Sequence, residues 1–202
     1  MTAGLGQGRH AGWPCRLTGF LAALVLLAGM AEPVRGADCV PAIEAQEARL
    51  ALPEGLLMAI ALTESGIDGR PWPWALNIGG EPAILPDAEA MRRTIAAHGG
   101  GRGGGRDDRP GPNIDVGCMQ ISLTWHADRF EDWRVLLEPE ANVAYGAWFL
   151  RRLFERHGSW TLAVAHYHSG SLDRQRAYVC RVWRHLVAIG GAAAPEVSAC
   201  AG

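Results

Sequence analysis

Glu64 is the residue whose position in the sequence is most favourable to acid–base chemistry. It closes residues 54–64, a segment so apolar that it is typical of a buried helix. The C-terminus of a helix is the negative end of its dipole, and apolar surroundings disfavour charge, so both raise the pKa of a carboxyl group there. A carboxyl that stays protonated near neutral pH is what a general acid requires. The position alone also suits a surface glutamate at a frayed helix end.

Asp115 is the nearby candidate for a second carboxylate. It falls within residues 113–121, which we expect to form a strand and a turn. Aspartate commonly stabilises turns, and we expect Asp115 to cap the strand in this way. If Asp115 instead reached the same site as Glu64, a water-using mechanism with two carboxyl groups would become possible.

Other arrangements of reactive residues are less favoured. His166 and His168 are two positions apart on a predicted helix, so they point to different faces, and we predict no metal site. Ser65 lacks the Gly-x-Ser-x-Gly turn of a hydrolase nucleophile. Cys118 has apolar neighbours, which favour an inert thiol. The glycines of residues 99–112 lack the context of a phosphate-binding loop.

Composition narrows the function classes further. All 19 basic residues are arginine, which excludes Schiff-base chemistry on lysine. The net charge of −2 argues against a nucleic-acid partner bound through a basic field. Hydrophobic residues make up 49% of the chain, which is enough for a packed core.

The elements that must position these residues are mostly helices. The pattern of apolar residues and caps predicts helices over residues 41–52, 54–64, 88–97, 139–157, 160–168 and 172–189. Apolar residues alternate with other residues along 71–86, on both sides of a turn at Gly79-Gly80, which predicts a small hairpin. We therefore expect an α+β fold, predominantly α, with one domain over residues 37–190, a flexible glycine-rich loop at 99–112 and a tail at 191–202.

The first 36 residues have the features of a signal peptide. Arg9 and Arg16 precede a 14-residue apolar run, and small residues around Gly36 suit cleavage after it. An uncleaved membrane anchor is the alternative. We predict export to the periplasm, with no membrane segment after cleavage. Removing Cys15 leaves Cys39, Cys118, Cys180 and Cys200, and we expect one disulfide bond among Cys39, Cys180 and Cys200, with Cys118 reduced.

Four short motifs then follow in order. They are Glu64-Ser65, Gly-Cys-Met-Gln-Ile at 117–121, His-Tyr-His-Ser-Gly at 166–170, and Tyr178-Val179 with Val182. This series resembles the bacterial lytic transglycosylases of the goose-lysozyme-like superfamily (the SLT domain), over roughly residues 40–187. Their motifs are Glu-Ser, Gly-Leu-Met-Gln-Ile, Ala-Tyr-Asn-Ala-Gly and a late tyrosine. His168, Ser169 and Cys118 depart from the pattern. Residues 72–77 and 114–116 look like a subgroup of secreted proteins, some of them associated with cell-envelope machinery.

The resemblance implies a lysozyme-like fold with a small antiparallel sheet beside an active-site cleft. It implies that Glu64 is the catalytic acid and base, that Met119 and Gln120 line the sugar cleft, and that Tyr167 orients the carboxyl group or the sugar. Aromatic faces can pack on sugar rings, and Trp72, Trp74 and Trp125 are candidates, whereas Trp148, Trp160 and Trp183 are expected in the core. The predicted substrate-binding residues are Ser65, Met119, Gln120, Tyr167, His168, Trp74, Asn77 and Tyr178.

The resulting hypothesis is a monomeric enzyme, without cofactor, that acts on the glycan strands of peptidoglycan. It would cleave the β-1,4 bond from N-acetylmuramic acid to N-acetylglucosamine and leave an anhydro-muramic end. A goose-type muramidase that uses water, with Asp115 in a catalytic role, is one alternative. A non-catalytic peptidoglycan-binding or assembly factor of a secretion or conjugation machine is another.

Overall fold

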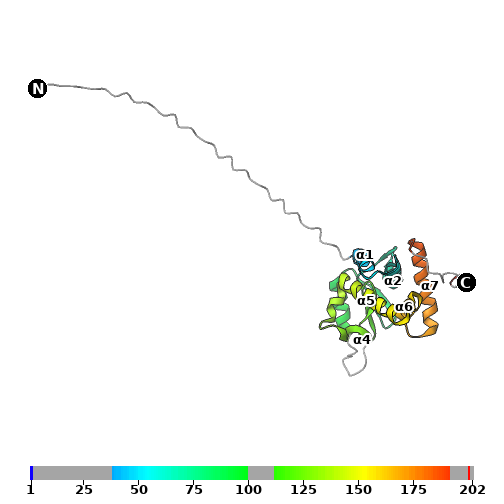
Figure 1. The fold of residues 1–202 in the computed structure, drawn as a ribbon. Coiled ribbons are helices and arrows are strands. Elements are labelled where there is room, and N and C mark those ends of the chain that lie inside the picture. Colours follow the sequence, from blue (N-terminus) through cyan, green and yellow to red (C-terminus); the bar gives the residue numbers. More distant parts are fainter. Residues whose placement is uncertain (2–37, 100–111, 192–199, 201–202) are drawn as a thin grey trace. The chain divides into compact units, whose positions relative to one another are not determined.

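The structure is a computed structural model that describes Met1, residues 38–99, residues 112–191 and Cys200. The predicted signal peptide, most of the glycine-rich loop and most of the tail therefore lie outside the described residues. Figure 1 labels the main helices. The α-helices are α1 (Cys39–Leu50), α2 (Leu56–Ser65), α3 (Ala88–Ala97), α4 (Leu123–His126), α5 (Pro139–His157), α6 (Trp160–His168) and α7 (Leu172–Ala188). Short 3-10 helices span Ala127–Arg129 and Trp133–Leu137. In the part of the chain that is described, no helix is both long enough and apolar enough to span a membrane.

Helix α2 lies in the core of the helical part. Six of its first seven residues are buried, which confirms the prediction of a helix surrounded by other elements. It packs against α1 and α7, while α5 packs against α1 and α6. Burying an apolar side chain stabilises the fold by roughly 1.5–3 kcal/mol, so this central helix is a firm support for the residue at its end, Glu64.

The N-terminus of α2 is capped by a side chain from α1. Gly55 occupies the cap position and offers no side chain. Instead the carboxylate of Glu47 accepts hydrogen bonds from the backbone N–H groups of Gly55 (3.1 Å), Leu57 (2.8 Å) and Met58 (3.1 Å). These N–H groups have no partner within the helix, and a negative group beside them is favoured by the helix dipole. Glu47 therefore anchors α2 to α1.

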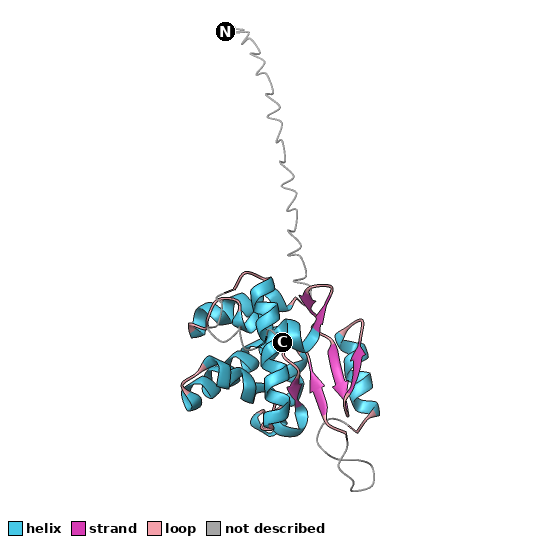
Figure 2. Ribbon diagram, turned by 90° about the vertical axis from the view of Figure 1, so that its right-hand side faces the viewer, coloured by secondary structure: helices cyan, strands magenta, loops and turns pink. Residues whose placement is uncertain are grey.

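The sheet is small and antiparallel, as predicted. Its strands are β3 (Ala75–Ile78), β4 (Glu81–Ile84), β5 (Ile114–Val116) and β6 (Ile121–Ser122), in the order β4-β3-β5-β6. A separate two-residue pair is formed by β1 (Gly66–Ile67) and β2 (Arg70–Pro71) directly after α2. In Figure 2 the larger strands lie to the right of most of the helices, with one further helix at the right-hand edge. The expected α+β fold, predominantly helical with a small sheet, is confirmed.

The register of the sheet aligns three polar residues. Asn77 on β3 is opposite Asp115 on β5, and Asp115 is in turn opposite Ser122 on β6. Residues directly opposite one another on neighbouring strands point to the same face of a sheet. One face of the sheet therefore presents a row made of an amide, a carboxyl and a hydroxyl group.

Two disulfide bonds close the fold; one is a bridge among Cys39, Cys180 and Cys200, as predicted, and the other corrects the prediction for Cys118. Cys39 is bonded to Cys118, with Cα atoms 6.1 Å apart, and Cys180 is bonded to Cys200, with Cα atoms 5.3 Å apart. The prediction that Cys118 stays reduced is wrong. Its apolar neighbours correctly indicate burial, but a buried disulfide is as compatible with an apolar environment as a buried thiol.

The tryptophans expected in the core are only partly there. Trp183 is buried, and Trp160 stacks on Phe154 with ring centroids 4.0 Å apart. Trp148 is a correction, because its side chain is 38% exposed and lies under the guanidinium of Arg129 at 5.8 Å. It sits on α5 beside Tyr145, at the outer side of an aromatic cluster.

Candidate active site

An open cleft lies where the end of α2, the face of the sheet and helices α4 to α7 come together. The polar and aromatic residues of its wall include Glu64, Asn77, Asn113, Asp115, Gln120, Ser122, Trp125, Tyr167, His168 and Arg174. Five residues predicted from the sequence to act in catalysis or sugar binding therefore share one surface: Glu64, Asn77, Gln120, Tyr167 and His168.

Glu64 lies in the last turn of α2 at this surface. Burial raises the pKa of its carboxyl group from 4.5 to about 7; the Asp115 carboxylate adds to the rise, while the Tyr178 hydroxyl and the Arg181 guanidinium oppose it. The direction is the one expected from the apolar helix that carries Glu64. At neutral pH the group can therefore both give and accept a proton, as a general acid–base catalyst must.

Tyr178 is the direct partner of Glu64. Its hydroxyl donates a hydrogen bond to Oε1 of Glu64 at 2.5 Å, from a side chain that is buried on α7. Burial and the nearby Glu64 carboxylate raise the pKa of Tyr178 well above its usual value, so it stays a neutral donor. The ring of His168 stacks on Tyr178 with centroids 4.3 Å apart. The resemblance implied that Tyr167 orients the carboxyl group or the sugar; the hydroxyl that bonds to the carboxyl group is that of Tyr178, and the role of Tyr167 toward the sugar stays a prediction.

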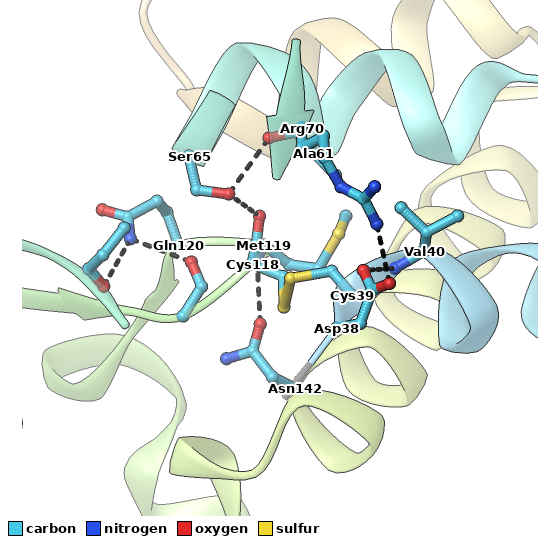
Figure 3. Close-up of a disulfide and its surroundings, with 12 residues drawn as sticks. Asp38, Cys39, Val40, Ala61, Ser65, Arg70, Cys118, Met119, Gln120 and Asn142 are labelled. Carbon is cyan, nitrogen blue, oxygen red and sulfur yellow. Dashed lines mark hydrogen bonds and ion pairs between the residues drawn. A yellow bond between two sulfur atoms is a disulfide. The ribbon is translucent and has the colours of Figure 1, made fainter. Parts of the chain in front are cut away.

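The turn between β5 and β6 is fixed to α2 through Ser65. The Ser65 hydroxyl is within hydrogen-bond distance of the carbonyl oxygens of Cys118 (2.8 Å) and Ala61 (3.2 Å), as Figure 3 shows. The adjacent disulfide from Cys118 joins the same turn to the start of α1. Gln120, at the end of the turn, donates from Nε2 to the carbonyl oxygens of Ala75 and Gly117, both at 3.0 Å.

Asn142 on α5 supports this turn from beneath. Its Oδ1 accepts from the backbone N–H of Met119 at 2.8 Å, and its Nδ2 donates to the carbonyl oxygens of Val116 and Leu136, both at 2.9 Å. Gly117 has a φ of +79°, and a Cβ atom there would lie 2.4 Å from Nδ2 of Asn142. Glycine is therefore required in this motif both by backbone conformation and by space.

Four predicted substrate-binding residues, Ser65, Met119, Trp74 and Tyr178, are not part of the cleft wall. Met119 is fully buried, and Ser65 is only 5% exposed. Tyr167 donates from its hydroxyl to the carbonyl oxygen of Met119 at 3.1 Å. Both side chains pack closely against Gly146, where a Cβ atom would lie within 3 Å of each of them. Met119 is buried because the inner side of the turn packs against the core. Ser65 and Met119 therefore lie behind the cleft wall, where they support the turn that carries Gln120.

Asp115 departs from its expected role. It is the central residue of β5 and faces the cleft, so the prediction of a turn-capping residue is wrong. Its Oδ1 accepts from Nδ2 of Asn113 at 2.7 Å, and Ser122 Oγ in turn donates to Oδ1 of Asn113 at 2.7 Å. Burial raises the pKa of Asp115, opposed by its hydrogen bonds to Asn113 and Ser122. The cleft wall thus contains a second carboxyl group besides that of Glu64.

The aromatic residues divide differently from the prediction. Trp125 is 78% exposed and lines the cleft, as expected. Trp74 does not, because it packs edge to face on Trp72, with centroids 5.7 Å apart, in a separate hollow. Trp72 Nε1 donates to the carbonyl oxygen of Leu85 at 2.8 Å, which holds the pair against the hairpin.

Sequence reasoning missed several residues of the site. Asn113 and Ser122 hold Asp115, Asn142 holds the turn, and Arg174 adds a positive charge to the wall. Only Asn142 could have been found from the sequence, because it is a polar residue within the apolar stripe of α5. A buried polar side chain needs hydrogen-bond partners, so its presence there indicates a structural role. Among the described residues, no three His, Cys, Asp or Glu side chains are grouped as metal ligands.

Comparison with protein families gives one informative match. The family model described as the transglycosylase SLT domain matches residues 41–179, which is more than half of the chain. Comparison with curated proteins and with solved structures gave no match. The matched range includes α2 with Glu64, the whole sheet, the turn with Gln120, and Tyr178. The chain therefore belongs to the transglycosylase SLT domain family.

Proposed function

We propose that the protein is a lytic transglycosylase that cleaves peptidoglycan glycan strands with Glu64 as acid and then base. One observation carries this proposal: a glutamate with a pKa of about 7 lies at the wall of an open cleft, at the helix end where the family motif begins. The supporting contact is the hydrogen bond from Tyr178, which fixes one carboxyl oxygen and leaves the other for substrate.

The reaction needs only this one carboxyl group. Protonated Glu64 gives its proton to the oxygen that links N-acetylmuramic acid to N-acetylglucosamine, and the bond from that oxygen to the anomeric carbon breaks. The acetamido group of the muramic residue stabilises the positive charge on the anomeric carbon. Ionised Glu64 then takes the proton of the 6-hydroxyl group as its oxygen attacks the anomeric carbon. The products are a free hydroxyl on one strand and an anhydro-muramic end on the other, without consumption of water.

Product analysis tests this proposal. Purified protein is incubated with peptidoglycan sacculi, the released fragments are separated, and their masses are determined by mass spectrometry. Anhydro-muramic ends, each lighter than a reducing end by one water, are expected, and reducing ends alone would contradict transglycosylation. Glu64→Gln is the matched control, because it preserves shape but cannot donate the proton.

A muramidase is the second candidate, and the position of Asp115 favours it. A second carboxylate in the cleft besides the acid is what inverting glycosidases use to activate water. Asp115→Asn separates the two reactions. If Asp115 activates water, the variant loses reducing-end products selectively; if Glu64 works alone, anhydro products persist.

We also propose that the enzyme works as a monomer in the periplasm, in association with cell-envelope secretion or conjugation machinery. The signal-like first 36 residues and the two disulfide bonds support an oxidising compartment. Fractionation of cells that express the full chain tests the location: release with the periplasmic contents is expected, whereas retention in the cytoplasm would exclude it.

A further inference from the structure

Helix α7 carries an excess of positive charge beside the cleft. Its 17 residues include four arginines and a single aspartate, whereas the whole chain has 19 basic and 21 acidic residues. All four arginine side chains are exposed. The excess is therefore local to one helix of a slightly acidic protein.

Two of these arginines, Arg174 and Arg181, are four residues before and three residues after Tyr178, so they share its face of α7. Arg174 is part of the cleft wall, and Arg181, two helical turns further on, lies over the ring of Tyr178 at 5.5 Å. His168 is also in the cleft wall. Burial is the main cause that lowers its pKa, and the guanidinium groups of Arg181 and Arg174 lower it further. The Arg181 guanidinium also lowers the pKa of Glu64, so Arg181 is within electrostatic range of that carboxyl group.

Neither arginine is neutralised by an ion pair within the described residues. The arginines of α3 and α5, by contrast, pair with glutamates one helical turn away, such as Arg92 with Glu89 at 2.9 Å and Arg152 with Glu155 at 2.9 Å. Arg174 also lies in the first turn of α7, where the helix dipole disfavours a cation. Two cations are thus kept beside the site at some cost and remain available to an anion.

We propose that Arg174 and Arg181 bind carboxylate groups of the peptide attached to the muramic acid at the cleavage point, so that peptide-bearing strands are preferred. This rests on the proposed function, because that function puts a muramic residue against Glu64. The peptide is attached to the lactyl group of the same sugar, and it carries several carboxylates. Guanidinium groups bind carboxylates with paired, charge-assisted hydrogen bonds.

Binding is measured with the catalytically silent Glu64→Gln variant, so that the substrate is not consumed. Two materials are compared by co-sedimentation: intact sacculi, and sacculi whose peptide carboxylates have been converted to amides with a carbodiimide and ammonia, which leaves the amide at the lactyl group in place. We expect about tenfold tighter binding to the intact material. Adding Arg174→Gln and Arg181→Gln together should remove this preference, so that the variant binds both materials alike. Raising the salt concentration reduces the preference in the same way, because screening weakens exposed charge pairs.

The control variant is Arg176→Gln on the same helix. Arg176 is exposed and outside the cleft wall, and at two residues from Tyr178 it lies on another face of α7, so its replacement should not alter the preference. Arg174→Gln alone is also measured, since Arg181 contacts Tyr178 and its loss could disturb the site. The proposal is overturned if the double variant weakens binding to both materials equally, or to neither.

Failure of the proposed function gives a different result. In that case the wild-type protein releases no anhydro-muramic ends from either material. The binding comparison uses the Glu64→Gln variant and needs no activity, so it still shows whether the two arginines bind the peptide carboxylates. In the active protein, Arg174→Gln alone should raise KM for intact sacculi severalfold with little change in kcat, which a general structural defect would not produce.

Discussion

The two ends of helix α2 each meet a glutamate carboxyl group, but the surroundings of the two groups are opposite. At the N-terminus, the Glu47 carboxylate accepts three backbone N–H bonds and lies at the positive end of the dipole. At the C-terminus, Glu64 has an apolar helix behind it, one hydroxyl donor and the negative end of the dipole. The two carboxyl groups thus differ through their surroundings: burial raises the pKa of Glu64, whereas three backbone donors and the positive helix end stabilise the Glu47 carboxylate.

The largest effect is expected at the chemical end. Glu64→Gln removes the transferable proton, and we expect activity on sacculi to fall by about a thousandfold, within the range for loss of a general acid–base group. Residual activity near the wild-type level would refute the assignment of Glu64.

The same variant should change the dependence of stability on pH. The pKa of Glu64 is about 7 in the folded protein and 4.5 ordinarily, so its full contribution is present below pH 4.5 and is lost as pH rises toward 7. The loss is up to about 3 kcal/mol. Urea unfolding at several pH values should show this decline in the wild type and a flatter curve in Glu64→Gln. Parallel curves for the two proteins would mean that the carboxyl is not perturbed.

The structural end should respond in stability and not in chemistry. Glu47→Ala leaves three N–H groups of α2 without their acceptor, and we expect a loss of about 2 kcal/mol of unfolding free energy, with activity per folded molecule retained. Glu44→Ala is the control, because Glu44 is an exposed residue of the same helix. If Glu47→Ala abolished activity in folded protein, the two ends would not be separable in function.

Tyr178→Phe makes a smaller change that sharpens the role of the single donor. The Tyr178 hydroxyl lowers the pKa of Glu64, so its removal should raise that pKa. Activity requires protonated Glu64 at the start of the reaction and falls as pH rises through about 7; in the variant this fall should move to higher pH, with kcat reduced about tenfold. Tyr167→Phe is the comparison, since Tyr167 bonds to Met119 and not to Glu64. An unchanged pH profile in Tyr178→Phe would contradict the contact.

The helices could be predicted closely because residues near each helix end determine where the helix begins and stops. The Asp87 side chain accepts from the backbone N–H of Ala90, and Ser159 accepts from that of Leu162, as expected of N-cap residues. Gly158 ends α5 in the left-handed conformation that favours glycine. Each of these signals acts within a few residues, so neighbouring sequence is enough to find it.

The position of Asp115 could not be found in the same way. Which face of the sheet it occupies depends on pairing with Asn77, 38 residues earlier, and a shift of one residue would turn it to the other face. Trp74 illustrates the same limit, because its contact with Trp72 and the hairpin, and not its spacing, sets its distance from the cleft. The site was predictable where a motif lies on one element, and not where two strands must meet.

The pairing of the four cysteines has a consequence for how the chain matures. In chain order the bridges are consecutive, since Cys39–Cys118 closes before Cys180–Cys200 begins. On the proposed route of export the chain emerges N-terminus first, so each cysteine pair can be oxidised as soon as its second cysteine appears. Because the two bridges are not interleaved, oxidation in this order forms the native pairs without later rearrangement. The first bridge closes a loop of 79 residues, which by chain entropy is worth about 4–5 kcal/mol. Vectorial oxidation would thus fasten the Met-Gln turn to α1 before α6 and α7 arrive to complete the cleft.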